Sequence, residues 1–129
     1  EDELGHENGI IHTQREEGPW WKVDLDAQYY ISQVIIYNRQ DLQPDLLRAE
    51  KRLQGFRVEI FNGDDINAIW TYNDPTPSDG SPGPEIWINI PICVLGDKVK
   101  ISIPGKLDYL HLREVEVLGS QTGNIAPCL

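Results

Sequence analysis

Two arginines and a histidine are the side chains in this sequence best suited to grip a small polar ligand. Arg39 follows an apolar stretch, Arg52 precedes the next one, and His12 lies near the start of the chain. A guanidinium offers five N–H donors in a rigid fork that can bond two adjacent hydroxyls of a sugar, and an imidazole can fix a third. The alternative is that each arginine pairs with a nearby carboxylate such as Asp41 or Glu50, and spacing alone favours this alternative.

No arrangement of residues in the sequence is typical of catalysis. The Gly-x-Ser-x-Gly elbow, the glycine-rich phosphate loop and the His-Glu-x-x-His motif are all absent. The chain holds 21 Asp and Glu residues, but none stands out as a shielded acid–base pair. Asp24 and Asp26 flank a predicted strand end, which favours turn and edge roles. We therefore expect a protein that binds a ligand and is not an enzyme.

The balance of charge restricts the possible partners. A chain of 129 residues suits a single domain with one hydrophobic core. Its net charge of -10 repels phosphate backbones and anionic membranes, which argues against a nucleic-acid partner. Neutral ligands, cations and basic proteins remain as possible partners. No apolar run approaches the roughly 20 residues of a membrane span.

Most of the sequence alternates apolar and polar residues with the period of two that is typical of half-buried strands. The predicted strands cover 20–25, 31–38, 56–60, 69–72, 86–90, 99–103 and 112–118. One segment differs, because Asp45–Arg52 follows Pro44 and consists of good helix formers, so we expect a short helical turn there. The pattern predicts an all-β sandwich of about seven to eight antiparallel strands.

The two cysteines, Cys93 and Cys128, leave two possibilities open. Their separation fits no clustered zinc motif, and the sequence has no Cys-x-x-Cys. They are either two unrelated thiols or a disulfide that ties the C-terminal tail, 120–129, back onto the sheet. The chain opens at Glu1 without a methionine, so we expect a processed or truncated sequence.

Four stretches of the sequence carry a family resemblance: Gly9–Leu25 (GIIHTQREEGPWWKVDL), Tyr37–Asp41 (YNRQD), Arg52–Phe56 (RLQGF) and Leu110–Val117 (LHLREVEV). They resemble the F-type lectins, or fucolectins, which belong with the discoidin and coagulation-factor C-type domains to the galactose-binding-like superfamily. The resemblance covers nearly the whole chain. It implies a single jelly-roll domain over 1–129 that lacks its N-terminal strands, and it favours the disulfide and a secreted or cell-surface setting.

The resemblance also implies a site for a sugar. In the family, a histidine after the first loop and two arginines that flank a short loop contact a terminal fucose, and these positions match His12, Arg39 and Arg52. The implied mechanism is reversible binding of a fucose or galactose-type sugar of a glycan, through hydrogen bonds to its ring and hydroxyl oxygens and an apolar wall against its less polar face.

A structural Ca²⁺ ion is implied as well. The family binds it through oxygens of the loop before the histidine and a glutamate of the last strand, which match Gly9 and Glu114, with Asp2 and Asn8 as a remnant of the loop. The alternative is that Glu114 is an ordinary carboxylate on a strand face.

The sequence departs from the family in three places. The family's first strands and its Asp-Gly-Asn calcium loop would lie upstream of Glu1. The segment Leu42–Lys51 replaces the two adjacent cysteines that usually lie between the arginines, so the pocket wall is remade. A further cysteine pair, near Ile10 and at Arg113, is absent. The alternative function is therefore a protein-interaction or structural module of a larger extracellular assembly, without a working sugar site.

Overall fold

The computed structural model describes residues 2–7, 11–38 and 51–121, and of residues 2–7, 11–12 and 121 it describes the backbone only. The described chain is built from strands and turns. The strands are β1 (Asp2–Glu7), β2 (Ile11–His12), β3 (Glu16–Glu17), β4 (Trp20–Asn38), β5 (Arg57–Phe61), β6 (Trp70–Asn73), β7 (Glu85–Ser102), β8 (Leu107–Asp108) and β9 (His111–Gln121). The predicted all-β sandwich is therefore confirmed.

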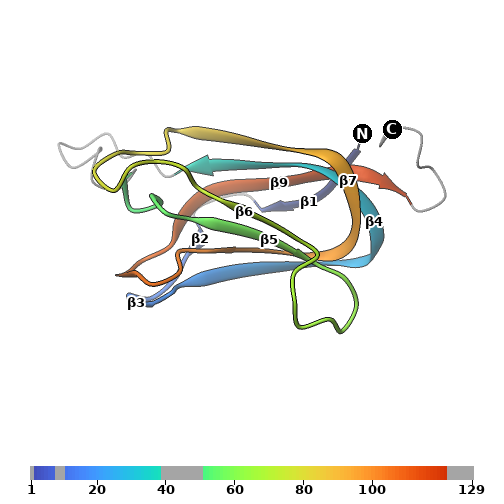
Figure 1. The fold of residues 1–129 in the computed structure, drawn as a ribbon, viewed down its shortest axis with the longest axis horizontal. Coiled ribbons are helices and arrows are strands. Elements are labelled where there is room, and N and C mark those ends of the chain that lie inside the picture. Colours follow the sequence, from blue (N-terminus) through green and yellow to red (C-terminus); the bar gives the residue numbers. More distant parts are fainter. Residues whose placement is uncertain (1, 8–10, 39–50, 122–129) are drawn as a thin grey trace.

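Two antiparallel layers face each other, and the long strands β4 and β7 run through both of them (Figure 1). Strand order is β1-β9-β4-β7-β5-β6, with β2 added beside β9 and a separate small sheet formed by β3 and β8. The end of β4 pairs with β9 and with the start of β7 in one layer. The start of β4 pairs with the end of β7, which also pairs with β5, in the other layer.

The sequence pattern divided β4 and β7 into separate strands, and the structure corrects this. The predicted strands 20–25 and 31–38 are two arms of β4. The predicted strands 86–90 and 99–103 correspond to one continuous strand, β7, which ends at Ser102. The polar break in the first pattern marks a bend: Asp26 has a φ of 67°, and its N–H donates to Asp24 Oδ1 over 2.9 Å. A bend of this kind lets a strand change layers without leaving the ladder.

Other predicted elements have mixed outcomes. Strands β5, β6 and β9 lie within one to three residues of the predicted ranges. Strand β1 was missed, because Asp2–Glu7 shows no apolar alternation and acquires its structure by pairing with β9. Most of the predicted helical turn at Asp45–Arg52 lies outside the described residues, as does most of the tail.

The core lies between the layers and is aliphatic, with Phe56 as its fully buried aromatic side chain among the described residues. Gly96 lies at the bend of β7, opposite Tyr29 of β4. A Cβ at this position would lie 2.6 Å from Ile60 Cγ2 and 3.0 Å from the carbonyl oxygen of Phe61, so only glycine permits this close approach. The described part of the chain contains no helix of the length and apolarity that crosses a bilayer.

Candidate functional site

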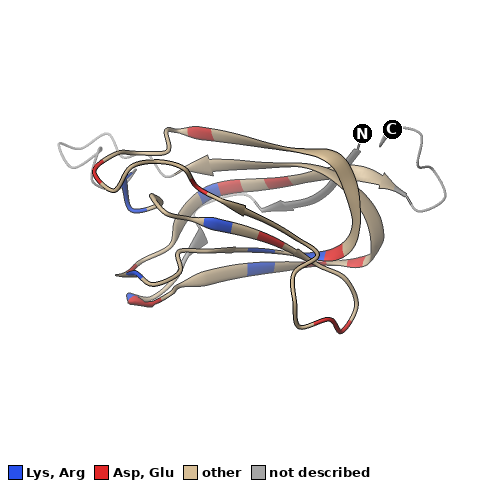
Figure 2. Cartoon of the chain, in the orientation of Figure 1, with Lys and Arg blue, Asp and Glu red and all other residues tan. Residues whose placement is uncertain are grey.

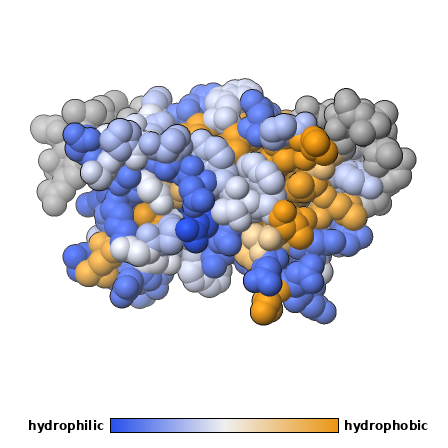
Figure 3. All heavy atoms as spheres, viewed as in Figure 1, coloured by the Kyte–Doolittle hydropathy of each residue, from blue (hydrophilic) through white to orange (hydrophobic). Residues whose placement is uncertain are grey.

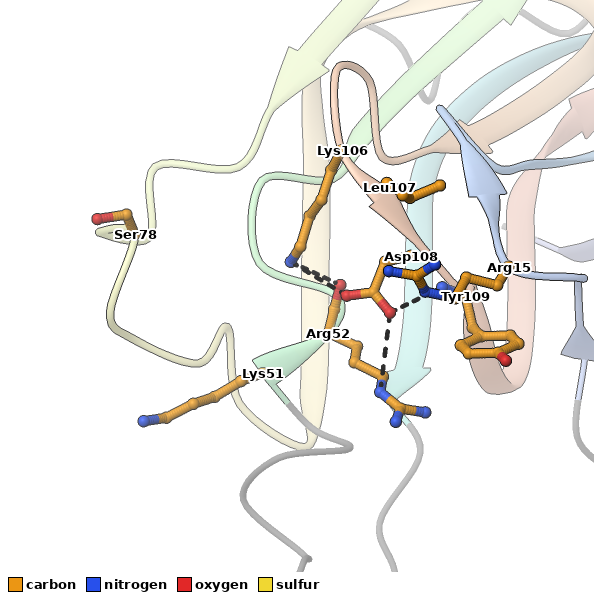
Figure 4. Close-up of a pocket in the computed structure, with 8 residues that line it drawn as sticks. All are labelled: Arg15, Lys51, Arg52, Ser78, Lys106, Leu107, Asp108 and Tyr109. Carbon is orange, nitrogen blue, oxygen red and sulfur yellow. Dashed lines mark hydrogen bonds and ion pairs between the residues drawn. The ribbon is translucent and has the colours of Figure 1, made fainter.

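One end of the sandwich carries a pocket of about 530 Å³. It is formed where turns and short strands meet, and Figure 4 shows the side chains that line it. The lining residues are Arg15, Lys51, Arg52, Ser78, Lys106, Leu107, Asp108 and Tyr109. Apart from Arg52, none of them was predicted from the sequence.

Strand pairing brings these distant segments together. Glu16 and Glu17 of β3 pair with Asp108 and Leu107 of β8, which places Arg15 at the edge of the pocket. Just before this pair, the hydroxyl of Thr13 accepts a hydrogen bond from the Leu110 N–H over 2.9 Å, and the Thr13 N–H donates to the Leu110 carbonyl over 3.1 Å. The backbone around the pocket is thus fixed on this side by a ladder.

The Arg52 side chain contacts three other residues of the site. Its Nη1 lies 3.4 Å from His111 Nδ1, its Nε lies 3.8 Å from Asp108 Oδ1, and its Cζ lies 5.3 Å from the centre of the Tyr109 ring. Because a guanidinium only donates, the imidazole must accept at Nδ1 for the first contact to be a hydrogen bond. The predicted alternative partners of Arg52 were Asp41 and Glu50, which lie outside the described residues; the described carboxylate partner is Asp108.

Lys106 fixes the turn that carries Arg52. Its Nζ donates to the carbonyl oxygens of Arg52 and Gln54, over 3.2 Å and 3.4 Å, and lies 3.9 Å from Asp108 Oδ2. In Figure 4, Lys106 and Arg52 approach Asp108 from two sides. The carboxyl group of Asp108 also accepts from the backbone N–H of Tyr109 over 2.8 Å. The turn and the loop before β9 are therefore held by several contacts to one carboxylate.

His111 lies under this cluster and is only 4% exposed. Its ring centre lies 5.5 Å from that of Tyr109. In the backbone ladder His111 is paired with His12, so β2 brings the predicted ligand residue next to the strand that supports Arg52. The backbone of His12 and the side chain of Arg52 therefore both lie beside His111.

The third, Arg39, lies outside the described residues, although the strand that leads to it is well fixed. Asn38, the last residue of β4, is fully buried, and its Nδ2 donates to the Gly83 carbonyl over 2.9 Å. Its backbone N–H donates to the Pro84 carbonyl over 2.9 Å. The chain therefore leaves β4 for Arg39 from a defined point.

The predicted calcium ligands fall into two groups. Asn8 and Gly9 lie outside the described residues, but their neighbours Glu7 and Ile11 have backbone partners on β9. These partners are Val115 and Leu112, which lie on either side of Glu114 in the sequence. The loop implied as a calcium ligand therefore begins and ends beside the implied glutamate, whose carboxylate is a hard oxygen donor that suits Ca²⁺.

Asp2 does not join this group. It pairs with Gly119, at the far end of the β1–β9 ladder from Glu114. Five residues of extended strand correspond to about 17 Å of backbone, so the backbone positions of these two predicted ligands lie far apart. Among the described residues, no three His, Cys, Asp or Glu side chains gather as a metal site.

The surroundings of Glu114 are nevertheless acidic. Glu114 is half-buried and opposite Tyr37 of β4. Burial raises the pKa of the Tyr37 hydroxyl to about 12, with further contributions from a hydrogen bond to Glu116 and from the negative charges of Glu116, Glu85 and Glu114. This face of the sheet thus combines several carboxylates with the Arg113 guanidinium, whose Cζ lies 5.5 Å from the centre of the Tyr37 ring.

Cys93 lies on β7 and is 9% exposed. Cys128 lies outside the described residues, so the disulfide between them remains a prediction.

The comparisons with known proteins agree on one kind of domain. Residues 5–90 match the family described as NedA-like, galactose-binding domain. Fucolectin-6 of Anguilla japonica is 30% identical over 119 residues, which is 91% of this chain and 58% of that protein. The chain thus spans little more than half the length of this relative.

Solved structures give the same result. A fucose binding module of Streptococcus pneumoniae, SpX-3, superimposes with a TM-score of 0.70 at 27% identity, covering 88% of this chain and 79% of the module. The lectin domain of Lectinolysin, solved with the Lewis B antigen, also gives 0.70 at 27% identity, covering 86% of this chain and 72% of that one.

Proposed function

The chain belongs to the NedA-like, galactose-binding domain family and resembles the F-type lectins within it. From this family membership we propose that the pocket binds a terminal fucose or galactose-type sugar of a glycan. The observation that carries the proposal is the position of Arg52. Its guanidinium lies at a pocket and is held by His111, Asp108 and Tyr109.

The contacts of Arg52 leave it capable of binding a sugar. A guanidinium has five N–H donors, and the contacts to His111 and Asp108 use Nη1 and Nε at 3.4 Å and 3.8 Å. These distances are long for charge-assisted hydrogen bonds. The remaining donors can reach two adjacent hydroxyls, while the neighbouring groups hold the fork in one orientation. Pre-orientation of this kind lowers the entropic cost of binding.

Tyr109 supplies the flat surface that a sugar requires. Its ring contacts both Arg52 and His111, and it also lines the pocket. An aromatic ring presents an apolar face to the C–H side of a sugar, while polar groups around it bind the hydroxyls. His12 and Arg39 complete the proposed site from β2 and from the end of β4. Their side chains are assigned by the family resemblance.

We also propose that Ca²⁺ stabilises the edge of the sheet near the sugar site, through Glu114 and oxygens of Asn8 and Gly9. When bound, the ion would neutralise the acidic face around Glu114 and hold the loop before β2 in place. The test is thermal unfolding with Ca²⁺ and with a chelator, because a ligand that binds only the folded state raises its stability. A calcium-dependent rise in melting temperature that Glu114→Gln removes is the expected result. Equal melting temperatures in both conditions would contradict the calcium proposal.

The proposed setting is extracellular or at the cell surface, with Cys93 and Cys128 joined as a disulfide that holds the C-terminal tail. Mass spectrometry after alkylation, with and without a reductant, tests the bond directly. Two alkylated cysteines in the unreduced protein would contradict it.

A glycan array in the presence of Ca²⁺ tests the sugar-binding proposal, with Arg52→Ala as the matched variant. We expect fucosylated or galactose-type glycans to bind the parent domain and not the variant, while circular dichroism shows that both are folded. A folded parent domain that binds no glycan would overturn the proposal and leave a protein-interaction or structural module.

A further inference from the structure

The pocket is positive on a protein that is strongly negative. The chain has a net charge of -10, yet four of the eight residues that line the pocket are Arg15, Lys51, Arg52 and Lys106, against the single carboxylate of Asp108. Figure 2 shows basic residues at this end of the molecule, where the turn before β5 and the tips of β3 and β8 meet. A hollow lined by one sign of charge concentrates the electric field within it.

Internal contacts neutralise only part of this charge. Asp108 lies between Arg52 and Lys106, at 3.8 Å and 3.9 Å. Arg15 and Lys51 are exposed, and neither has a carboxylate within ion-pair distance among the residues that the structure describes. Glu16 and Glu17 are close along β3 but do not line the pocket. The pocket therefore holds more positive charge than its own acid can balance.

The surplus sits beside the sugar-binding group. Arg52 belongs both to the proposed sugar site and to this pocket, so the groups attached to a sugar on Arg52 would lie in a hollow that the other cations also line. A neutral sugar does not need four cations around it, and unpaired like charges in one hollow repel each other. A sulfate ester or a carboxylate would relieve that repulsion. Arg and Lys are the side chains that proteins use for both groups.

We propose that the preferred ligand is an anionic glycan, in which a sulfate ester or a carboxylate lies next to the sugar bound by Arg52. This inference rests on the proposed sugar-binding function and specifies the class of glycan. Arg15 and Lys51 are the residues that confer the anionic preference. Lys106 contributes charge while its ammonium also holds the turn of Arg52 and Gln54.

Calorimetry with three matched oligosaccharides tests the inference. The probes are one neutral fucosylated oligosaccharide, its sulfated form and its sialylated form. We expect one or both anionic forms to bind about tenfold more tightly than the neutral form at low salt, and the advantage to shrink as salt screens the charges. The sulfated and sialylated arms distinguish a sulfate ester from a carboxylate as the source of the charge.

The double variant Arg15→Gln/Lys51→Gln locates the effect. Its ratio of neutral to anionic dissociation constants should fall to about twofold or less, because exposed ion contacts are the interactions removed. Lys22→Gln is the control, since it removes one charge from an exposed residue on the start of β4, outside the pocket. Its ratio should remain close to that of the parent protein.

The failures are distinguishable. Equal binding of neutral and anionic forms overturns the anionic inference and leaves the sugar-binding proposal intact. An anionic preference that Lys22→Gln reduces as much as the double variant also overturns it, because net charge would then explain the effect. No binding of any form overturns the sugar-binding proposal and this inference with it.

Discussion

Two hollows on this domain contain the same kinds of side chain, cations beside aromatic rings, and use them differently. The pocket at the end of the sandwich places Arg52 against Tyr109, His111 and Asp108. A second hollow, of about 340 Å³, lies on the outer strand face and includes Trp20, Phe61 and Ile66 beside Lys22 and Lys100. There Lys22 lies over the Phe61 ring at 5.0 Å, and Lys100 lies over the Trp20 ring at 5.4 Å.

The two hollows differ in the residues that hold their cations in place. Arg52 has a buried imidazole and a fixed carboxylate as further partners, and Lys106 holds its backbone. In the second hollow Trp20 is 53% exposed and Ile66 is 90% exposed, so the lining itself lies largely in solvent. On the face seen in Figure 3, the residues of high hydropathy gather mainly on the side away from the pocket end. A rigid, supported fork is suited to specific binding, and a solvated cation over a ring mainly covers apolar surface.

The largest expected effect comes from replacing the fork while keeping the charge. Arg52→Lys should weaken glycan binding by roughly 30-fold or more, since a lysine cannot bond two hydroxyls in one plane and a hot-spot side chain contributes about 2 kcal/mol or more. Calorimetry with the glycan identified by the array measures this. The matched control is Lys100→Arg in the second hollow, which should bind as the parent does. Equal losses in both variants would remove the distinction between the hollows.

Loss of the contact between His111 and Arg52 should have the second-largest effect on glycan binding. His111→Leu removes the acceptor at Nδ1, so we expect roughly tenfold weaker binding, because a hydrogen bond to a charged group contributes about 1.5–3 kcal/mol and part of it is replaced by water. His111→Gln retains an acceptor and should lose less. Dissociation constants for both variants, with circular dichroism as a check on folding, are the measurement. Identical affinities for the two variants would show that His111 acts only by filling space.

A smaller effect is expected on stability. Lys106→Met removes the hydrogen bonds to the carbonyls of Arg52 and Gln54 and should lower the free energy of unfolding by about 1 kcal/mol. Lys22→Met, in the second hollow, should change it by less than about 0.5 kcal/mol, because its contact to Phe61 is exposed. Urea unfolding compares the two variants. If Lys22→Met lowered the free energy of unfolding more than Lys106→Met, the second hollow would be the one whose lysine contributes more to stability.

The smallest expected effect concerns Trp20, and its replacement tests whether a sugar binds in the second hollow. Trp20→Ala should leave the glycan dissociation constant within about twofold of the parent value, as is usual for side chains outside an interface. An exposed tryptophan is the type of residue on which sugars stack, so a loss of binding would place the sugar in the second hollow. The array and calorimetry already described provide the readout.

Much of the fold could be predicted from the sequence, and the exceptions have a common cause. The alternation in 99–103 and 112–118 and the β-branched and aromatic residues of 31–38 identified strands that the structure contains. Strand β1 could not be predicted, because its residues gain structure from β9 and not from their own pattern. The continuity of β4 through its bend was also hidden, since Asp24 and Asp26 resemble an ordinary turn.

The candidate site could likewise be predicted only in part from the sequence. Residue type and resemblance predicted Arg52 and His12 as candidate ligand residues, and the composition gave the negative net charge. Neither could identify Asp108, His111 or Lys106 as partners of Arg52, because alternation tells which face a residue occupies but not which strand lies beside it. Packing of the turn before β5 against β8 and the start of β9 decided those neighbours. Only the tertiary structure therefore showed a positive pocket on a negative protein, since the charges that form it come from segments that meet through long-range packing.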